Sequence, residues 1–557
     1  MHKTCKNCSA EFEIFPEDQE FYKKMDVPAP TICPECREQR RAGWRNERNL
    51  YYRMCNATQK KILSAYHPST KITVYDNDYW YSDKWDGLIF GKNFDFSRLF
   101  LDQFTELFRE VPQLARSATG NQNCDYVNQC GWCKNCYLIF EADGDEGCMY
   151  SSHIYDSRFC LDSSYITNSE LCYECVDCQN CYDSQFLVNC QNCSESFFLQ
   201  NCVGCKNCFG CVNLRNKQYY FSNETCTKEE YFQILQEVFV NQHQPRKEVK
   251  KSFFEEYIVR FPQKHIHSIQ NEDSSGDYLQ NTKNCQYSFD VQNSRDIKYV
   301  YDSRNLKNVY DMLVFGAGKG AEFCYEVHEI GDGVRNIFFS DQIWSGCHDI
   351  WYSKLCIQNS HNLFGCISLK HKSYCILNKQ YSKEEYDALI PKIMEHMKKT
   401  GEFGEFFPIS LSPFAYNETI AMQYYPLEKA EVLQRQWKWR EAEEPNFSGI
   451  TKKIPAVKLP PTIERIPDDI LNWAIGCEES GKFFKIQKAE LEFYRRMNLP
   501  IPHFHPDIRH AHRMALRNPR KLWDRNCMKC EKYIRTTYAQ ERPEIVYCES
   551  CYLKEVY

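Results

Sequence analysis

The two ends of the chain are copies of one another, and both copies carry cysteines at metal-binding spacing. Residues 12–55 align with residues 484–527 without a gap, with 17 identities in 44 positions. Each end also has two Cys-x-x-Cys pairs, which can complete a closed tetrahedral shell of four thiolates around one ion, the pattern of structural zinc. The sequence therefore predicts two Zn2+ sites, neither with the open coordination position that a catalytic zinc needs. The predicted ligands are Cys5, Cys8, Cys33 and Cys36 in the first site and Cys527, Cys530, Cys548 and Cys551 in the second.

Each copy has kept one cysteine cage and lost the other. In the C-terminal copy, the four positions of the first cage hold Cys477, Ser480, His505 and Ile508. In the N-terminal copy, the four positions of the second cage hold Cys55, Thr58, Asp76 and Tyr79. We infer a tandem two-ribbon unit that was duplicated, with one zinc left in each copy. Four C-terminal histidines, at 503, 505, 510 and 512, could rebuild a site with Cys477, but their spacing fits surface or core positions better.

A stripe of arginines follows the first-cage positions in both copies. Residues 37–53 and 509–525 are compatible with helices, and the shared arginines fall in one sector of the helical wheel. These arginines are Arg37, Arg41, Arg45 and Arg48 in one copy and Arg509, Arg513, Arg517 and Arg520 in the other. Guanidinium groups at this spacing suit the phosphates of a nucleic-acid backbone. The alternative is a solvated face, or arginines that pair with the acidic 11–20 stretch and stack on Trp44 or Trp523.

The middle of the chain is also duplicated. Residues 209–231 align with residues 364–386 with 11 identities, and the similarity extends upstream, so that residues 121–240 and 276–398 are two versions of one domain. Within the first version, cysteines recur 21 residues apart between short segments rich in Tyr, Phe, Val and Ser. A period near 20 residues built from short strands is typical of a β-solenoid. The many asparagines suit the left-handed corners that such coils need.

The first solenoid part is rich in cysteine, with 17 cysteines in residues 124–226. Four of them, spaced three residues apart from Cys172 to Cys181, suggest a metal cluster. The second version argues against one, because Val327 and Ile330 occupy the positions of Cys175 and Cys178. A position that accepts Val or Ile is a packing position, where a free cysteine behaves as a small hydrophobe. The alternatives are further zinc, another soft metal, or disulfides.

These patterns predict a mainly β fold with helical caps: a Cys/Asn-rich β-solenoid in two homologous parts, flanked by duplicated zinc-ribbon modules. The boxes Thr227–Glu230 and Ser382–Glu385 predict the start of a helix at the end of each solenoid part. An amphipathic helix within 97–116 is expected to cover the first coil. The expected domains are a tandem ribbon module at 1–90, a capping helix at 91–120, solenoid parts at 121–240 and 276–398, linkers at 241–275 and 399–470, and a second ribbon module at 471–557.

Composition narrows the function classes. With 69 basic and 75 acidic residues, the chain as a whole does not attract nucleic acid, and any attraction must come from a local patch. The sequence has neither an 18-residue apolar run nor a secretory signal, so we expect a soluble protein of the reducing cytoplasm without a membrane partner. No Ser/His/Asp or Cys/His set stands out, and an enzyme is therefore not indicated.

The terminal modules resemble a set of uncharacterised zinc-ribbon proteins encoded by small-genome bacteria. The segments that carry the resemblance are residues 5–36 with Phe21-Tyr22 and Pro28-x-Pro30, Ile534–Tyr538 with Val546–Tyr552, and the stretch Ser412–Thr419. The resemblance covers most of the chain and implies zinc binding, without implying an activity.

Two functional hypotheses follow. The first is an architectural protein that docks on RNA, DNA or a ribonucleoprotein through the arginine-striped modules. The second is a protein–protein scaffold that uses the extended solenoid surface. An enzyme or a thiol-based metal store has less support from the residues.

Overall fold

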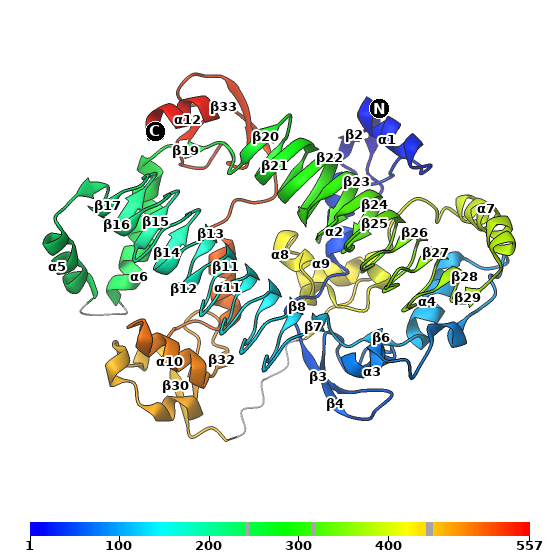
Figure 1. Cartoon of the computed structure of the whole chain (residues 1–557), viewed down its shortest axis with the longest axis horizontal. Helices are drawn as coiled ribbons and strands as arrows, with labels where there is room; N and C mark the ends of the chain where they lie inside the picture. The colour runs from blue at the N-terminus through cyan, green and yellow to red at the C-terminus, as the bar shows by residue number, and fades with distance from the viewer. Residues whose placement is uncertain (240–243, 315–317, 442–448) are drawn as a thin grey trace.

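Two β-solenoids lie side by side, with a terminal module docked around them at each end of the chain (Figure 1). The computed structural model describes residues 1–239, 244–314, 318–441 and 449–557. It confirms the predicted fold class, because parallel strands form two long stacks, with few helices and two four-cysteine clusters at the termini. No helix in these described ranges is long and apolar enough to cross a membrane.

The first solenoid stacks its coils in parallel at a register of 12 residues. Ser152 pairs with Ser164, and Ser164 pairs with Val176. A residue with left-handed backbone recurs at every third position, as at Asn180 and Asp183, so each coil has four sides of three residues. The strands are β7 (Ala118–Thr119), β8 (Asn128–Gly131), β9 (Phe140–Asp143), β10 (Ser152–Tyr155), β11 (Ser164–Thr167), β12 (Glu170–Tyr173), β13 (Val176–Gln179), β14 (Tyr182–Val188), β15 (Phe197–Gln200), β16 (Lys206–Val212), β17 (Gln218–Phe221) and β18 (Glu224–Thr225).

The second solenoid has longer strands and a less regular register. Cys285 pairs with Ile297 at a spacing of 12, whereas Ile337 pairs with Ile350 at a spacing of 13. Its strands are β20 (Ile269–Glu272), β21 (Gly276–Gln286), β22 (Ser288–Arg304), β23 (Leu306–Leu313), β24 (Ala321–His328), β25 (Val334–Phe338), β26 (His348–Trp351), β27 (His361–Phe364), β28 (Ser373–Ile376) and β29 (Lys379–Gln380). Insertions between coils are tolerated because each coil bonds only to its neighbours.

The coil length differs from the expected period of about 20 residues. In a 12-residue coil with three-residue sides, every third residue points inside. Two cysteines separated by any multiple of three residues can therefore both point inward. The spacing of 21 between Cys160, Cys181 and Cys202 is such a multiple and not the length of a coil. The αL corners expected for asparagine are present, for example at Asn168 and Asn189.

The solenoid cysteines fill the interior, as predicted from the second version of the domain. Cys160, Cys181 and Cys202 are 0%, 1% and 0% exposed. The Sγ atom of Cys160 lies 3.3 Å from the carbonyl oxygen of Arg158 and 3.5 Å from that of Ser169, as expected of a weak thiol donor. All 33 cysteines are free, and among the described residues only the two terminal clusters bring their sulfurs close enough for a shared metal.

Helices close the far end of each solenoid, as the capping boxes predict. The backbone N–H of Glu230 donates to Thr227 Oγ1 at 3.2 Å, and that of Glu385 donates to Ser382 Oγ at 3.2 Å. In the second solenoid, Tyr386 packs on Tyr374 of the last coil. The closing helices are α5 (Lys228–Phe239) on the first solenoid and α7 (Lys383–Thr400) on the second, whereas α6 (Gln244–Lys251) runs along the side of the first, where Lys250 pairs with Glu174.

The amphipathic helix before the solenoids, α4 (Phe100–Glu110), was expected to cover the first coil, and this prediction is wrong. It packs against the second solenoid, where the ring of Phe100 lies 5.3 Å from that of Tyr352 and 5.5 Å from that of Phe364. The physical reason is complementarity. The aromatic stripe of α4 needs an apolar surface, and the outward residues of the first coil, such as Gln122 and Asn123, are polar.

The terminal modules consist of short hairpins and helices. The N-terminal module contains β1 (His2–Thr4), β2 (Glu11–Glu13), α1 (Pro16–Lys24), α2 (Pro34–Ala42), β3 (Tyr51–Met54), β4 (Lys61–Ser64), β5 (Val74–Tyr75) and α3 (Asn77–Tyr81). The C-terminal module contains β31 (Trp473–Gly476), β32 (Phe483–Phe484), α10 (Lys488–Arg496), α11 (Pro506–Met514), β33 (Trp523–Asn526), β34 (Tyr533–Thr536), β35 (Val546–Tyr547) and α12 (Glu549–Val556). The remaining strands and α-helices of the described residues are β6 (Gln113–Leu114), β19 (Gln263–Lys264), α8 (Ala421–Tyr424), α9 (Lys429–Gln434) and β30 (Lys452–Pro455).

Each module contacts both solenoids in the same crossed way. The second half of the N-terminal module pairs β5 with β6, which leads into the first solenoid, whereas helix α2 of its first half lies on β23 and β24 of the second. The C-terminal module pairs β35 with β19, which leads into the second solenoid, whereas α11 lies against the first. The halves of the chain are therefore intertwined like the subunits of a swapped dimer.

Candidate metal centres and the buried arginine helices

The four cysteines of the N-terminal cluster come from a hairpin turn and a helix start. Cys5 and Cys8 lie in the turn between β1 and β2, Cys33 immediately precedes α2, and Cys36 lies in its first turn. Their four sulfurs all lie within 4.8 Å of one another, and those of Cys8 and Cys33 are 3.7 Å apart. Sulfurs held about 2.3 Å from a tetrahedral zinc would be roughly 3.8 Å apart. The geometry therefore fits zinc.

The backbone around this cluster favours thiolates. The N–H groups of Cys33 and Asn7 point at the Sγ atom of Cys5, at 3.3 and 3.4 Å. Burial alone raises the pKa of Cys5, but these backbone donors outweigh it and bring the pKa down to about 6. A thiolate is the form that binds the metal, so the fold prepares the ligand.

The C-terminal cluster repeats this arrangement. Cys527 and Cys530 follow β33, Cys548 precedes α12, and the Sγ atoms of Cys530 and Cys548 are 3.7 Å apart. The N–H of Cys548 lies 3.2 Å from the Sγ atom of Cys527 and helps to lower the pKa of that thiol to about 6 against the effect of burial. The prediction of two zinc sites is confirmed. When bound, zinc supplies cross-links within each module, and its closed shell leaves no position for a substrate.

The lost cage of the N-terminal copy is closed by hydrogen bonds. In the N-terminal copy, the carboxylate of Asp76 accepts from the thiol of Cys55 at 3.3 Å, from the hydroxyl of Thr58 at 3.1 Å and from the backbone N–H of Tyr79 at 3.0 Å. All three partners stand at former ligand positions. One carboxylate thus replaces the ion as the common acceptor of the knuckle and the helix start.

The C-terminal histidines do not rebuild the other lost cage. His503 is bonded to Glu478, and the Nε2 atom of His512 lies 2.9 Å from a carboxylate oxygen of Glu479. His510 faces Gln423. In the part of the chain that the structure describes, no metal-ligand group contains these histidines or the former cage cysteine.

Comparison with known families finds a match for the first half of the N-terminal module. Residues 1–44 match a family model described as a probable treble clef domain. This agrees with the geometry, because the second cysteine pair opens a helix in both modules instead of forming the second β-knuckle of a ribbon. No curated protein matches the chain. The protein is therefore a zinc-binding protein with two four-cysteine sites.

The arginine stripe of the N-terminal module is not on the surface. Arg37 and Arg41 are 1% and 0% exposed. The Nε atom of Arg37 lies 2.9 Å from Asp311, and Arg41 bridges Asp311 and Glu326 at 3.4 and 3.3 Å. Both acids stand at left-handed corners of neighbouring coils of the second solenoid. Helix α2 is thus fixed to that solenoid by buried ion pairs.

Helix α11 makes the equivalent contact with the first solenoid. Arg509 and Arg513 both pair with Asp162, and a second nitrogen of Arg513 donates to the carbonyl oxygen of Tyr150 at 2.8 Å. The Asp162 side chain is 0% exposed. On helix α2, Arg40 lies outside the predicted stripe and forms a further ion pair with Glu326 of the second solenoid, at 2.8 Å.

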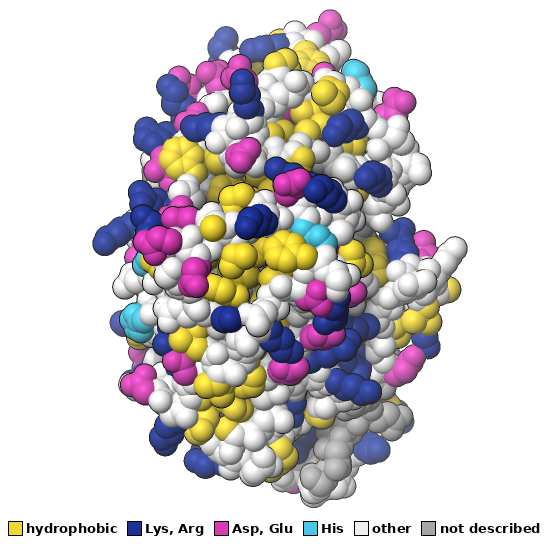
Figure 2. All heavy atoms as spheres, turned by 90° about the vertical axis from the view of Figure 1, so that its right-hand side faces the viewer, with side chains coloured by type: hydrophobic (Ala, Val, Ile, Leu, Met, Phe, Trp, Pro, Cys, Tyr) yellow, Lys and Arg dark blue, Asp and Glu magenta, His cyan; other side chains and the backbone are white. Residues whose placement is uncertain are grey.

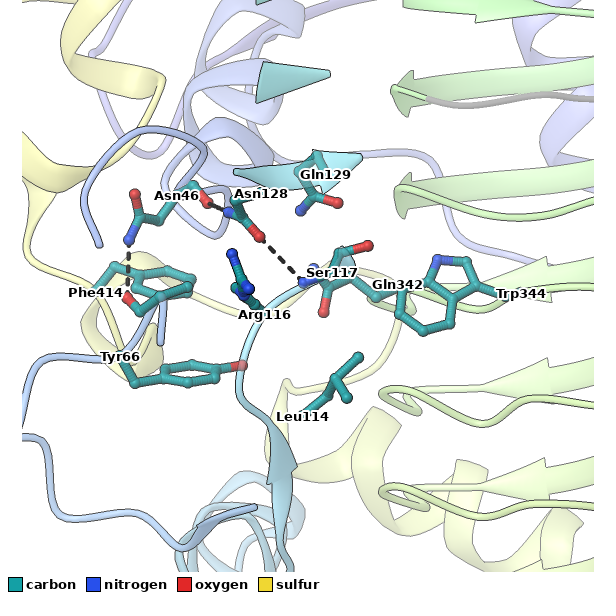
Figure 3. Close-up of a pocket in the computed structure, with 11 residues that line it drawn as sticks. Asn46, Tyr66, Leu114, Arg116, Ser117, Asn128, Gln129, Gln342, Trp344 and Phe414 are labelled. Carbon is teal, nitrogen blue, oxygen red and sulfur yellow. Dashed lines mark hydrogen bonds between the residues drawn. The ribbon is translucent and has the colours of Figure 1, made fainter. Parts of the chain in front are cut away.

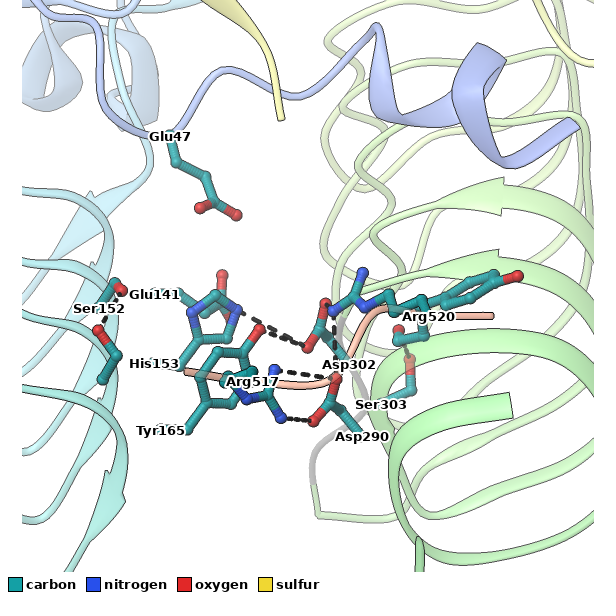
Figure 4. A network of polar contacts seen from close by, with 12 residues as sticks. Glu47, Glu141, Ser152, His153, Tyr165, Asp290, Asp302, Ser303, Arg517 and Arg520 are labelled. Carbon is teal, nitrogen blue, oxygen red and sulfur yellow. Dashed lines mark hydrogen bonds and ion pairs between the residues drawn. The ribbon is translucent and has the colours of Figure 1, made fainter. Parts of the chain in front are cut away.

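The later arginines join the two solenoids (Figure 4). Arg517 pairs with Asp177 of the first solenoid at 2.9 Å and with Asp290 of the second, and Arg520 pairs with Asp290 and Asp302. Their side chains are 6% exposed.

In the N-terminal copy, Arg45 contacts Glu141 of the first solenoid and Glu329 of the second, together with its own neighbour Glu47. Arg48 alone remains near solvent, 3.4 Å from Asp507. The predicted phosphate-binding surface is therefore wrong for seven of the eight arginines, because carboxylates of this chain already occupy them. A buried guanidinium without such a partner would be strongly unfavourable.

Sequence reasoning missed the acidic partners, although a signal for them exists. The motif Cys-Tyr-Glu is aligned in the two solenoid versions, at Glu174 and Glu326, and an aspartate stands one coil earlier, at Asp162 and Asp311. Three of these four acids pair with the arginine helices, and the fourth, Glu174, pairs with Lys250. The two solenoids have acids at matching corners, and the chain has two matching arginine helices. This combination indicates ion pairs between the helices and the solenoids. Reading that signal requires the coil length, which the 21-residue spacing obscures.

Proposed function

We propose that the protein is a zinc-stabilised scaffold that binds another protein along the uncovered sides of its solenoids. The observation that carries this proposal is the burial of the arginine helices. Both terminal modules use their charged faces to hold the solenoids, so the exposed sides of the solenoids remain as a regular, extended surface for a partner. Stacked-repeat proteins commonly bind through such extended surfaces.

The uncovered side of the first solenoid carries a ladder of amides. Asn168, Asn180 and Asn192 stand one coil apart and are exposed, and the Nδ2 atom of Asn180 donates to Asn192 Oδ1 at 3.1 Å. We call these three residues the amide ladder. It offers donors and acceptors without the desolvation penalty of charged groups, which suits the polar surface of a protein partner.

The charge distribution also favours a protein partner over a polyanion. On the face of the molecule shown in Figure 2, basic and acidic side chains are interspersed, and no large single-sign patch forms there. A polyanion is drawn by a local excess of positive charge. A mixed surface lacks that attraction.

The test is affinity capture of partners from the native cytoplasm by the full chain, with and without exhaustive nuclease treatment. The variant Asn168→Asp/Asn192→Asp places two charges on the amide ladder while keeping side chains that tolerate the left-handed corners. The matched control, Asn281→Asp/Asn305→Asp, changes asparagines at left-handed corners of the second solenoid.

We expect a specific protein that survives nuclease treatment, is lost at least tenfold in the ladder variant, and is retained by the control. Equal capture by the ladder variant and the wild type would contradict the proposed surface. Disappearance of the partner on nuclease treatment would contradict a protein scaffold.

Nucleic-acid binding remains a second candidate, on a different surface. In the second solenoid, Lys283, Arg295 and Lys307 stand in register on successive strands, followed after Glu322 by Arg335. If this column contacts phosphates, Arg295→Gln/Arg335→Gln should reduce the slope of log K against log salt by about two. An unchanged slope and affinity for bulk cellular RNA would exclude this surface.

A further inference from the structure

A small cavity lies where the N-terminal module meets the start of the first solenoid and a side of the second (Figure 3). Its volume is about 20 Å3, and its lining includes Tyr66, Arg116, Ser117, Asn128 and Gln342. We propose that this cavity binds the oxyanion group of a small carboxylate or phosphate ligand, with Arg116 as the charged partner.

Arg116 is a half-buried cation that forms no close ion pair in the described part of the chain, and the carboxylate of Asp125 acts on it only from beyond ion-pair distance. Its Nη1 atom donates to the carbonyl oxygen of Val127 at 2.8 Å, and among the described ion pairs Arg116 takes part in none. Burial lowers the pKa of Arg116 from its ordinary value. This contrasts with the arginines of α2 and α11, which all face carboxylates. A desolvated guanidinium of this kind is stabilised by any oxyanion that reaches it.

The internal duplication supplies a matched comparison, because the same junction is built a second time at the C-terminal module. Ser64 Oγ donates to the carbonyl oxygen of Ala115 at 3.1 Å, and Thr536 Oγ1 donates to that of His265 at 2.6 Å. Two further hydrogen bonds are equivalent: the backbone N–H of Ser117 donates to the side-chain Oδ1 of Asn128, and the backbone N–H of His267 donates to the side-chain Oδ1 of Asp277.

In the C-terminal junction, the chain provides its own carboxylate. Asp277 accepts from Thr537 Oγ1 at 2.5 Å and lies 3.1 Å from His267 Nδ1, and its pKa is lowered because these donors and the His267 charge outweigh the effect of burial. The position before His267 is Ile266, so no arginine is present there.

In the N-terminal junction, each of these groups is replaced. Asn128, Ser117 and Ala65 stand where Asp277, His267 and Thr537 stand in the other copy, and Arg116 stands in place of Ile266. The carboxylate is gone, a cation has been added, and smaller side chains leave the cavity. An external oxyanion in this space would restore the charge balance that Asp277 provides in the other half of the molecule.

The dimensions limit the ligand. A volume of about 20 Å3 has room for roughly one water-sized group. One end of a carboxylate or phosphate can enter the cavity and contact the guanidinium group of Arg116 and the neutral donors of Ser117 and Gln342. The rest of the ligand stays outside the cavity, because several lining residues are only half-buried and leave it open to solvent. Direct contact with an anionic group needs donors only, and the lining supplies them.

The test is calorimetric titration of the zinc-loaded full chain with sodium acetate and, separately, with sodium phosphate, each against sodium chloride at equal ionic strength. We expect one saturable site per chain with a dissociation constant below about 1 mM for at least one of the two anions. The arm that binds identifies the ligand as a carboxylate or a phosphate.

Arg116→Gln should weaken binding at least tenfold, whereas Arg109→Gln, at an exposed arginine outside the cavity lining, should leave it unchanged. A second variant, Ala65→Thr/Asn128→Asp, rebuilds the internal carboxylate but removes the bonds from Asn128 Nδ2 to the carbonyl oxygens of Asn46 and Glu47, at 3.0 and 3.1 Å. It should abolish binding, and zinc content and circular dichroism show whether the protein has folded. The proposal is overturned if neither anion binds saturably, or if either variant, folded, binds as well as the wild type.

Discussion

Removing the carboxylate that holds helix α11 tests the buried ion-pair network most directly. Asp162 is the shared partner of Arg509 and Arg513, and all three side chains are at most 4% exposed. In Asp162→Asn, the side chain keeps its shape and its left-handed backbone, but both guanidinium groups lose their common counterion. Arg513 then retains only neutral acceptors, Tyr150 O and Ser164 Oγ.

The expected loss of stability is large. Breaking a buried ion pair by removing one partner typically costs about 3–5 kcal/mol, because the remaining charge is left desolvated. Arg509 keeps a weaker contact with Glu490 at 3.5 Å, which limits its share of the loss. Asp156→Asn is the matched control. Asp156 also stands at a left-handed corner of the first solenoid but is exposed, so its change should stay within about 0.5 kcal/mol.

The assay is urea unfolding of zinc-saturated protein, combined with hydrogen exchange of the α11 amides to locate the effect. We expect α11 and the C-terminal module to open first in Asp162→Asn, since their anchor to the first solenoid is weakened. A variant whose midpoint and α11 protection match those of Asp156→Asn would show that these ion pairs do not hold the halves together. The interpretation of the arginine helices would then be refuted.

Three further predictions follow from the same contacts. Native mass spectrometry should count two zinc ions per chain, and Cys8→Ser or Cys530→Ser should each remove one of them; additional bound metal would revive a thiol store. Cys175→Val should leave the free energy of unfolding nearly unchanged, because the second solenoid has valine at the corresponding position. A loss of more than about 2 kcal/mol in that free energy would contradict a simple packing role. Burial raises the pKa of Asp302, but the charge of Arg520 outweighs burial and brings the pKa below the ordinary value of 3.8. The ionised Asp302 therefore stabilises the fold fully above pH 3.8, and this contribution is lost as the pH falls through the folded-state pKa. Acid titration of Asp302→Asn should show a shallower loss of stability below pH 4 than the wild type; identical slopes would contradict the pairing.

The sequence is sufficient for the metal sites because their chemistry is local. Two residues between thiolates define a knuckle whatever the surrounding fold, and Cys5 and Cys8 could be recognised without any knowledge of distant contacts. The solenoid was predictable for a similar reason, since its pattern repeats along the chain. Its coil length was not, because a three-residue side produces coincidences at every multiple of three, and the cysteines happen to emphasise 21.

The docking of the helices was missed because their partners lie hundreds of positions away and line up at matching corners only once the coil length is known. Arg37 meets Asp311 across 274 residues, and Arg513 meets Asp162 across 351. An arginine stripe on an isolated helix has the same pattern whether it faces phosphate, water or a buried carboxylate. The same limit explains the position of α4, whose apolar face was evident but whose partner lies on the second solenoid and not the first.

The duplication explains why the arginines looked like a functional surface. A residue kept in two copies of a module is usually taken as a sign of a shared external ligand, yet an intertwined molecule uses each internal interface twice. In each module, the arginine helix packs on one solenoid, and a short strand pairs with the segment that precedes the other solenoid. Both copies therefore need the same arginines to hold the two solenoids together. The informative positions are then the ones where the copies differ while their surroundings match. Arg116 against Ile266, and Asn128 against Asp277, are such positions, and of the two junctions that the duplication builds they mark the N-terminal one, where the cation forms no ion pair in the described part of the chain.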